Sequence, residues 1–154
     1  MASEVLILLL ASLAQAASSP PAPEWLTCSS YRTREGGIRV VDQFAHVYFD
    51  SGSARIDEQG AATLDRYAAY VQPPPNCHVI IAGHADMVGR PEANLELSRR
   101  RAEAVDAYLR ARGVTGPISI EFFGETRPMV ETPDGTPEPE NRRVEVFVSQ
   151  PPTP

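Results

Sequence analysis

The sequence contains no lysine, so all 14 of its basic residues are arginine, and 20 acidic residues give it a formal net charge of −6. A domain that binds nucleic acid through a diffuse positive field carries the opposite charge, so this class of function is excluded. Long apolar runs are also lacking, because the run at residues 5–14 is well short of the roughly 20 residues that cross a bilayer. With 154 residues the chain has room for one ordinary domain.

Motifs of enzyme and metal chemistry are missing as well. None of the three histidines, His46, His78 and His84, lies in a His-Glu-x-x-His pattern. No serine or cysteine lies in a nucleophile motif. We therefore expect no catalytic activity, no cofactor and no metal site.

The short apolar run near the N-terminus predicts an export signal over residues 1–16. It ends in Ala14-Gln15-Ala16, the small-x-small form that signal peptidase requires. Glu4 is unusual in such a signal, because no arginine or lysine accompanies it. Residues 17–39 follow as a Pro-rich linker and N-terminal extension, and residues 151–154 form a Pro-rich tail.

Only two cysteines are present, Cys28 and Cys77. In an oxidising compartment they can form one intramolecular disulfide, which would tie the N-terminal extension to the body of the protein. In the chain-entropy model, a disulfide that closes this loop stabilises the folded protein by roughly 4 kcal/mol. Two free thiols are the alternative. We do not expect Cys28 to carry a lipid, because Trp25-Leu26-Thr27 before it is a poor lipid-attachment box.

Four segments have the composition of β-strands. Residues 44–49 are rich in aromatic and β-branched side chains, and residues 143–148 alternate valine with other residues. Residues 78–82 are apolar or nearly so throughout, which predicts a central strand covered on both faces. A further strand is expected at residues 118–123, and the Pro- and Gly-containing segment 124–140 is expected to be a loop.

Two segments have the periodicity of amphipathic helices. The first begins after Asp57, a good N-cap, and prolines 73–75 end it. Its expected buried face consists of Ala61, Leu64, Ala68 and Val71. The second runs from residue 91 or 92 to residue 112, with Gly113 after its end. Its expected inner face consists of Leu95, Ala102, Val105 and Leu109.

The order of these elements is β-α-β-α-β-loop-β. It predicts one domain over residues 40–150 with an α+β fold. We expect a two-layer sandwich with a mixed four-stranded sheet.

Polar segments follow or precede three of these elements. Gly83-His84-Ala85-Asp86 closes the central strand, residues 94–102 open the second helix, and Asn141-Arg142-Arg143-Val144 enters the last strand. The fold can return Arg101 beside Asp86 with a pocket between them. A guanidinium binds a carboxylate and an aspartate accepts from an ammonium, so this pair is suited to a zwitterionic ligand. A plain ion pair that braces the strand end is the alternative.

These segments resemble the OmpA-like C-terminal domain family over residues 40–150. Residues 83–86 are similar to the family's Gly-His-Thr-Asp turn, and residues 94–102 fit its Asn-x-x-Leu-Ser-x-x-Arg-Ala helix start. Residues 141–144 fit its Asn-Arg-Arg-Val strand start, and residues 49–53 resemble its Phe-Asp-x-x-Ser segment. The resemblance implies a non-catalytic domain that binds peptidoglycan in the periplasm of Gram-negative bacteria.

The resemblance also implies a site. In the family an aspartate and an arginine clamp the zwitterionic end of meso-diaminopimelate in the stem peptide. These roles fall on Asp86 for the ammonium and Arg101 for the carboxylate. Asn94 would orient the loop and contact the peptide, and Arg142 would add a contact at the rim. Ala85 replaces the family's threonine or serine, which removes a hydroxyl but not a backbone N–H, so hydrogen bonds between the main chain and the ligand should survive.

Other polar residues of these motifs are expected to be structural. Arg99 and Arg100 point to other sides of the helix than Arg101, because a helix turns by about 100° per residue, and we expect them to be solvated. Asp50 and Ser51 are expected to shape a turn. His84 is expected to be a structural histidine rather than, with Asp86, a metal ligand.

We therefore expect peptidoglycan binding in the periplasm, with an association with the outer membrane or a partner protein there. The alternative is a periplasmic interaction or scaffold domain that has lost cell-wall binding. Ala85, the apolar Met87 and Val88, and the lack of the family's usual means of membrane attachment motivate this alternative.

Overall fold

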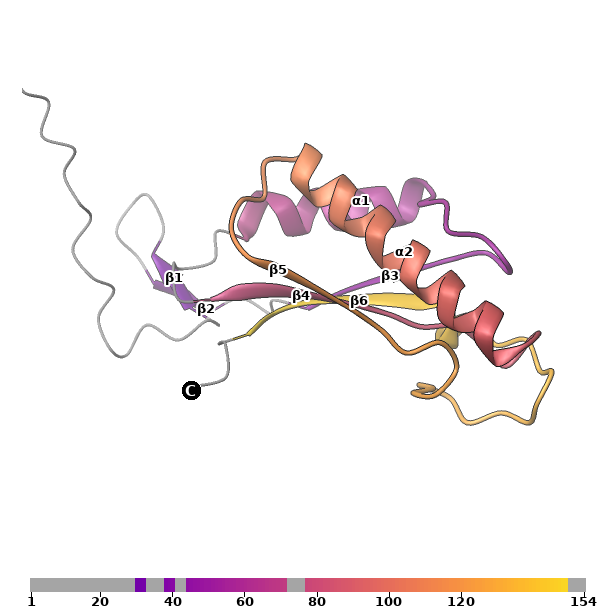
Figure 1. Cartoon of the computed structure of the whole chain (residues 1–154). Coiled ribbons are helices and arrows are strands. Elements are labelled where there is room, and N and C mark those ends of the chain that lie inside the picture. The colour runs from indigo at the N-terminus through magenta and orange to yellow at the C-terminus, as the bar shows by residue number, and fades with distance from the viewer. Residues whose placement is uncertain (1–29, 33–37, 41–43, 72–76, 150–154) are drawn as a thin grey trace, which may run out of the picture.

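Two helices and a four-stranded sheet form the body of the molecule. The structure is a computed structural model and describes residues 30–32, 38–40, 44–71 and 77–149 (Figure 1). The elements are β1 (Ser30–Arg32), β2 (Ile38–Val40), β3 (Ala45–Tyr48), α1 (Glu58–Tyr70), β4 (His78–Gly83), α2 (Pro91–Ala111), β5 (Ile118–Phe122), the 3₁₀ helix η1 (Pro139–Asn141) and β6 (Arg143–Ser149). The predicted export signal, Cys28 and the predicted C-terminal tail lie outside the described residues.

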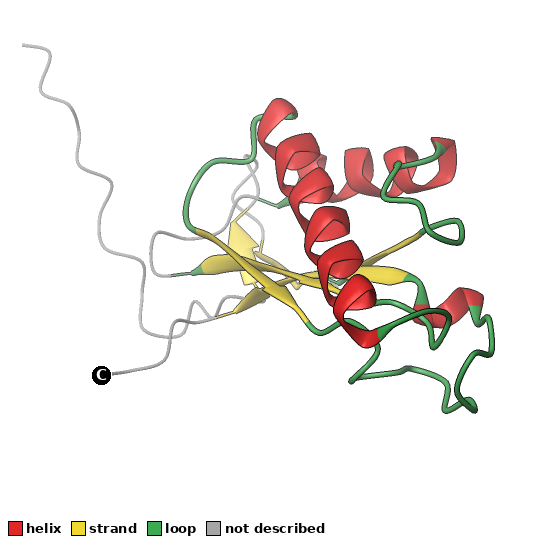
Figure 2. Ribbon diagram, turned by 45° about the vertical axis from the view of Figure 1, so that its right-hand side comes forward, coloured by secondary structure: helices red, strands yellow, loops and turns green. Residues whose placement is uncertain are grey.

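The sheet has the strand order β3-β6-β4-β5. Strand β6 pairs antiparallel with both β3 and β4, whereas β4 and β5 are parallel. Both helices cover the same face of the sheet (Figures 1 and 2). The predicted two-layer α+β fold with a mixed four-stranded sheet is thereby confirmed.

The core lies between the helices and the covered face of the sheet. Alternate strand residues line up across the strands, with Val146 of β6 opposite both Ala45 of β3 and Ile81 of β4. Val47, Val79, Ile81, Val144 and Val146 are fully buried against Leu64 of α1 and Val105 and Leu109 of α2. Each such side chain contributes about 1.5–3 kcal/mol when it leaves water.

Strand β4 is central in the sheet, as predicted, but it is not covered on both faces. His78 and Ile80 point to the face opposite the helices and are only half-buried. Both described helices lie on the other face (Figure 2). The apolar run over residues 78–82 is therefore typical of a central strand, and within the described residues the prediction that both of its faces are covered was wrong.

Helix α1 begins where its sequence provides a cap. An Oδ atom of Asp57 accepts a hydrogen bond from the backbone N–H of Gly60 at 2.7 Å, which satisfies one of the free donors of the first turn. Leu64, Ala68 and Val71 are buried as predicted, and Ala61 is half-buried. The helix ends at Tyr70, ahead of the prolines at 73–75, which lie outside the described residues.

Helix α2 begins with Pro91 at its first position and ends at Ala111, shortly before Gly113, whose φ of +85° suits a helix end. Ala102, Val105 and Leu109 are fully buried as predicted. The prediction for Leu95 was wrong, since this residue is 43% exposed. The first turns of α2 extend past the strand ends, so Leu95 lies beside the loop that follows β5, whereas Leu97 is buried.

The N-terminal extension contains a short hairpin that the sequence analysis did not predict. Strands β1 and β2 pair antiparallel, with Ser30 opposite Val40.

Within the described part of the chain, no helix combines the length and apolar character needed to cross a membrane.

Candidate functional site

The site begins where β4 comes unusually close to α2. A Cβ atom on Gly83 would lie 2.1 Å from the carbonyl oxygen of Ser98, so only glycine fits here. Ser98 then joins α2 to the loop after β5, because its Oγ accepts a hydrogen bond from the N–H of Gly124 at 3.0 Å. The N–H of Ala85 donates to the Gly124 carbonyl at 2.8 Å. This N–H is thus used within the protein, and main-chain hydrogen bonding to a ligand stays a prediction.

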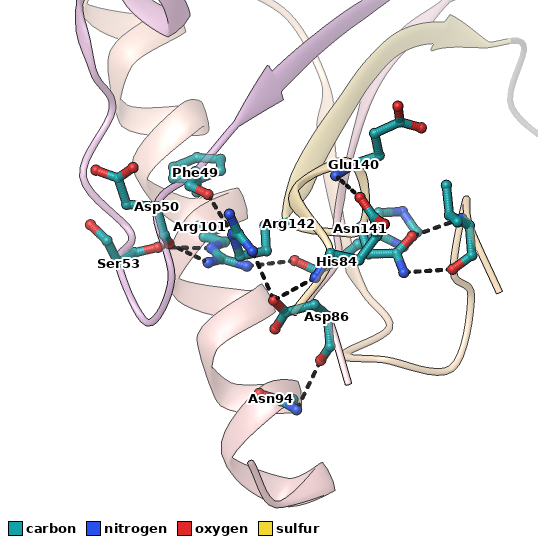
Figure 3. Close-up of polar contacts among 12 residues, drawn as sticks. Phe49, Asp50, Ser53, His84, Asp86, Asn94, Arg101, Glu140, Asn141 and Arg142 are labelled. Carbon is teal, nitrogen blue, oxygen red and sulfur yellow. Dashed lines mark hydrogen bonds and ion pairs between the residues drawn. The ribbon is translucent and has the colours of Figure 1, made fainter. Parts of the chain in front are cut away.

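Arg101 is fully buried and holds two turns together. Its Nε donates to the carbonyl of Ser53 at 2.8 Å and its Nη2 to that of Asp50 at 3.0 Å, both in the turn after β3. Its Nη1 donates to the carbonyl of His84 at 2.9 Å (Figure 3). The guanidinium also lies 5.2 Å from the centre of the Phe49 ring. One side chain of α2 therefore fixes the ends of β3 and β4 relative to each other.

Burial affects the charge of Arg101 without removing it. Loss of water lowers the pKa of this guanidinium to about 10, and the nearby Asp86 carboxylate opposes the lowering. A group with this pKa is positively charged at neutral pH. The site therefore contains a buried cation beside the carboxylate of Asp86.

Asp86 is paired with Arg142 and not with Arg101. Its Oδ2 lies 3.0 Å from Nη1 of Arg142 and accepts a longer hydrogen bond, 3.3 Å, from the N–H of Glu138. The Nε of Arg142 donates to the carbonyl of Phe49 at 3.0 Å. Among the described residues no hydrogen bond or ion pair joins Asp86 to Arg101. The alternative of a plain Asp86–Arg101 ion pair is therefore not what the structure contains.

Asn94 holds the turn that carries Asp86. The side chain is buried, and its Nδ2 donates to the carbonyl of Asp86 at 3.1 Å and to Oε2 of Glu125 at 2.6 Å. The amide thus ties this turn to the loop after β5. This is an orienting contact of the kind expected for Asn94, whereas its contact with a ligand stays a prediction.

Asn141 braces the long loop before β6. It is fully buried, and its Oδ1 accepts from the N–H groups of Met129 at 2.8 Å and Val130 at 2.9 Å. Its Nδ2 donates to the Val130 carbonyl at 2.7 Å. Asn141 thus satisfies backbone groups of the loop that delivers the Glu138 N–H to Asp86 (Figure 3).

An open pocket of about 260 Å³ lies beside Asp86. Its wall is built from the turn after β3, the turn after β4 and one side of α2: Ser51, Gly52, Asp86, Val88, Gly89, Ala93, Asn94, Leu97 and Arg100. Asp86 and Asn94 were expected at such a site. Ser51 and Arg100 were expected to be a turn residue and a solvated residue. Arg101 and Arg142 lie beside the pocket without lining it.

The position of Arg100 in the pocket wall could be predicted only partly from the sequence. Ala93, Leu97 and Arg100 are spaced by four and three residues, which places them on one side of a helix. Helical periodicity therefore groups them. It does not say that the turn containing Ser51 and Gly52 lies across from them, since that depends on the packing of β3 against β6.

His84 is buried next to the site in an unusual setting. It is 3% exposed, and within the described chain neither ring nitrogen makes a hydrogen bond. Its ring lies tilted by 36° against that of Phe123, with the ring centres 5.4 Å apart. Its Nε2 lies 3.9 Å from Oε1 of Glu145, which is paired with Arg143 at 2.7 Å. Burial, followed by the charge of Arg143, lowers the pKa of His84 to about 4. The histidine is therefore neutral at pH 7. No group of three or more metal-ligating side chains occurs among the described residues.

The lowered pKa of His84 predicts a loss of stability in acid. The unfolded chain binds a proton near pH 6.5 and the folded chain only near pH 4, so stability is complete above about pH 6.5 and falls as the pH drops toward 4. We expect the wild type to lose about 3 kcal/mol more than His84→Phe between pH 7 and pH 4. Urea unfolding of both proteins at several pH values measures this difference. Parallel pH profiles would show that His84 is not protected from protonation.

Comparison with known proteins places this geometry in a family. The OmpA family profile matches residues 48–142, which include Asp86, Asn94, Arg101 and Arg142. The chain belongs to the OmpA family. The family expected from the sequence motifs is thus confirmed.

Relatives of known name support the same assignment. The peptidoglycan-associated lipoprotein of Pasteurella multocida is 37% identical over 112 residues, which cover 70% of this chain and 75% of that protein. The protein of the same name from Haemophilus influenzae is 36% identical over 112 residues and is covered to 73%. The crystal structure of the peptidoglycan-associated lipoprotein from Burkholderia pseudomallei superposes with a TM-score of 0.61 at 32% identity, covering 68% of this chain and 89% of that one. This OmpA family member therefore has the fold of these relatives.

Proposed function

We propose that this OmpA family protein binds peptidoglycan without catalysis, and that it recognises the meso-diaminopimelate residue of the stem peptide. The names of the relatives support the first part. The observation that carries the proposal is a buried carboxylate, Asp86, that lines a pocket and lies near the buried guanidinium of Arg101 and the half-buried guanidinium of Arg142.

The arrangement suits a zwitterionic ligand, which carries a positive and a negative group. The free end of meso-diaminopimelate carries an ammonium and a carboxylate on one carbon. Oδ2 of Asp86 is engaged by Arg142 and by the Glu138 N–H, so Oδ1 is the oxygen proposed to accept from the ammonium. Hydrogen bonds between charged groups are the stronger ones, and burial of Asp86 strengthens them further.

The contributions of the other site residues differ. Asn94 and Arg142 hold the turn and the carboxylate group of Asp86 in place. Arg101 adds positive charge beneath the pocket and fixes the two turns that form its walls. Its contact with the ligand carboxylate stays a prediction: its side chain is fully buried, and three of its five N–H groups donate to carbonyls.

Pelleting with isolated sacculi tests this function. Asp86→Asn keeps the shape of the side chain but removes its charge, so we expect binding to sacculi that contain diaminopimelate to weaken at least about tenfold. Asp106→Asn is the matched control, since Asp106 pairs with Arg110 on α2 outside the pocket. Sacculi with lysine in place of diaminopimelate lack the second carboxylate and should bind the wild type more weakly. Equal pelleting of wild type and Asp86→Asn would overturn the proposed site.

The same experiment separates the competing function. An interaction or scaffold domain that has lost wall binding would leave even the wild type in the supernatant. We place the protein in the periplasm, with attachment to the outer membrane through a partner protein. The Cys28–Cys77 disulfide also belongs to this proposal: Cys77 is 2% exposed just before β4, and Cys28 lies outside the described residues.

A further inference from the structure

Strand β5 is an edge strand whose outer side is unpaired. Among the strands that the structure describes, only β4 is hydrogen-bonded to it in the sheet. The N–H of Phe123, just after β5, donates to the carbonyl of Gly83 at 3.0 Å. Backbone groups alternate in direction along a strand, so in this register the N–H and C=O groups of Ile118, Ile120 and Phe122 point away from β4.

This edge is apolar and ends in an apolar pocket. The side chains of Ile120 and Phe122 are 36% and 40% exposed on the face of the sheet that the helices cover. Just past the strand, Phe123 and the exposed Leu95 line a pocket of about 210 Å³ between the start of α2 and the loop after β5. The other lining residues are Pro91, Glu92, Glu125 and Thr126.

The charge beside this pocket is negative. Two of its lining residues are glutamates and none is basic. Glu92 of α2 and Glu121 of β5 are exposed, and neither has a hydrogen-bond or ion-pair partner in the part of the chain that the structure describes. The guanidinium of Arg127 is held over the ring of Phe123, 3.7 Å from its centre, and does not line the pocket. A basic partner can therefore engage free carboxylates here, whereas a second copy of this chain would add further carboxylates to the same edge.

We infer that this edge binds an extended segment of a partner protein. The segment adds as a strand to β5, places an apolar side chain in the pocket and sets a lysine or arginine beside Glu92. In strand addition the main-chain hydrogen bonds supply affinity, and pockets for alternate side chains select the segment. This inference does not rest on the proposed peptidoglycan binding, because neither β5 nor Leu95 lines the pocket beside Asp86.

Titration of the isotope-labelled full chain with a short synthetic peptide, followed by nuclear magnetic resonance, tests the inference. The probe alternates leucine with threonine and has arginine at both ends, so it can add in either direction. At up to about 1 mM peptide, the amide resonances of Ile118, Ile120 and Phe122 should shift more than those of Ser119 and Glu121, because only the first three gain an acceptor. Glutamate in place of the arginines should weaken binding about tenfold.

Two methylated peptides test the strand geometry. Methyl groups on alternate backbone nitrogens remove the donors from one side of an extended peptide. One of the two possible alternations should therefore bind as the parent peptide does, and the other should not bind. If both bind equally well or equally poorly, the segment does not add as a strand and the inference fails.

Protein variants test the pocket. Leu95→Ser should bind the peptide about tenfold more weakly than the wild type. Met129→Ser is the matched control, since Met129 is 42% exposed and lies outside the pocket, and it should bind as the wild type does. Equal binding by Leu95→Ser and the wild type would show that the pocket takes no side chain, which overturns the inference.

The remaining outcomes separate this surface from its alternatives. No shift of the β5 amides at any peptide concentration overturns the inference. Shifts of the same amides with protein concentration, in the absence of peptide, mean that a second copy occupies the edge and also overturn it. Leu95→Ser should pellet with sacculi as the wild type does, so failure of the proposed function is detected independently of this surface.

Discussion

Replacing Arg101 with methionine should lower the free energy of unfolding by about 3–5 kcal/mol, because buried carbonyl groups lose the guanidinium that donates to them. The guanidinium is fully buried and satisfies the carbonyls of Asp50, Ser53 and His84. Methionine fills much of the same volume but leaves the carbonyls of Ser53 and His84 without a donor, whereas the Asp50 carbonyl still accepts from the N–H of Ser53. Each unsatisfied buried group costs about 1–3 kcal/mol. The loss should therefore exceed the effect of removing a surface charge.

Urea unfolding at pH 7 measures this effect, and Arg100→Met is the matched control. The control makes the same substitution one residue earlier, where the side chain is exposed and has no partner among the described residues, so we expect a change within about 0.5 kcal/mol. Arg101→Lys should fall between the two, since one ammonium cannot reach carbonyls in both turns with the same geometry. A loss below about 1 kcal/mol for Arg101→Met would contradict the role assigned to these hydrogen bonds.

The stability test also affects how a loss of ligand binding in Arg101 variants is interpreted. The resemblance to the family predicts that Arg101 contacts the ligand, and a loss of binding in an Arg101 variant would support such a contact. Here the same loss is expected from the fold alone, because Ser51 and Gly52 of the pocket wall belong to the turn that Arg101 holds. Binding by Arg101 variants must therefore be read beside their stability.

Much of the fold follows from local patterns. The valines of β6 alternate with half-buried residues as a strand with one buried face requires, and Asp57 caps α1. Leu95 shows where local patterns fail. Its spacing from Ala102 fits the buried face of α2, but at this end of the helix Leu95 lies beside the loop after β5 and is exposed. A local sequence pattern does not predict where the sheet beneath a helix ends.

The sequence motifs predicted that four residues of the candidate site lie near one another, but not which contacts they make. The motifs bring Asp86, Asn94, Arg101 and Arg142 to one region, and the structure places all four there. The pairing of Asp86 with Arg142 joins residues 56 positions apart and depends on how β6 lies beside β4. Charge alone could not predict which of the two nearby arginines pairs with Asp86. The guanidinium of Arg101 donates to backbone carbonyls instead, and no sequence motif predicts these contacts.

Gly83→Ala should cost about 3 kcal/mol in the free energy of unfolding, the upper part of the range for overpacking a core. The added Cβ would lie 2.1 Å from the carbonyl oxygen of Ser98 and 2.9 Å from its carbonyl carbon. Both are backbone atoms of α2, so no rotation of a side chain can relieve the contact. The helix must move away from β4, and this movement stretches the hydrogen bond from Gly124 to Ser98.

Gly60→Ala is the comparison for this prediction. Its Cβ would also meet close neighbours, but these are side-chain atoms of Val47 at 2.9 Å and Asp57 at 3.2 Å, and alanine favours the helix by about 1 kcal/mol over glycine. We therefore expect Gly60→Ala to cost far less in the same urea titration. Gly83→Ala should in addition weaken sacculus binding at temperatures where it is still folded, because α2 carries Asn94 and Arg100 while the turn after β4 carries Asp86. Unchanged binding would mean that the pocket tolerates a shift between helix and strand, and that its two walls act independently.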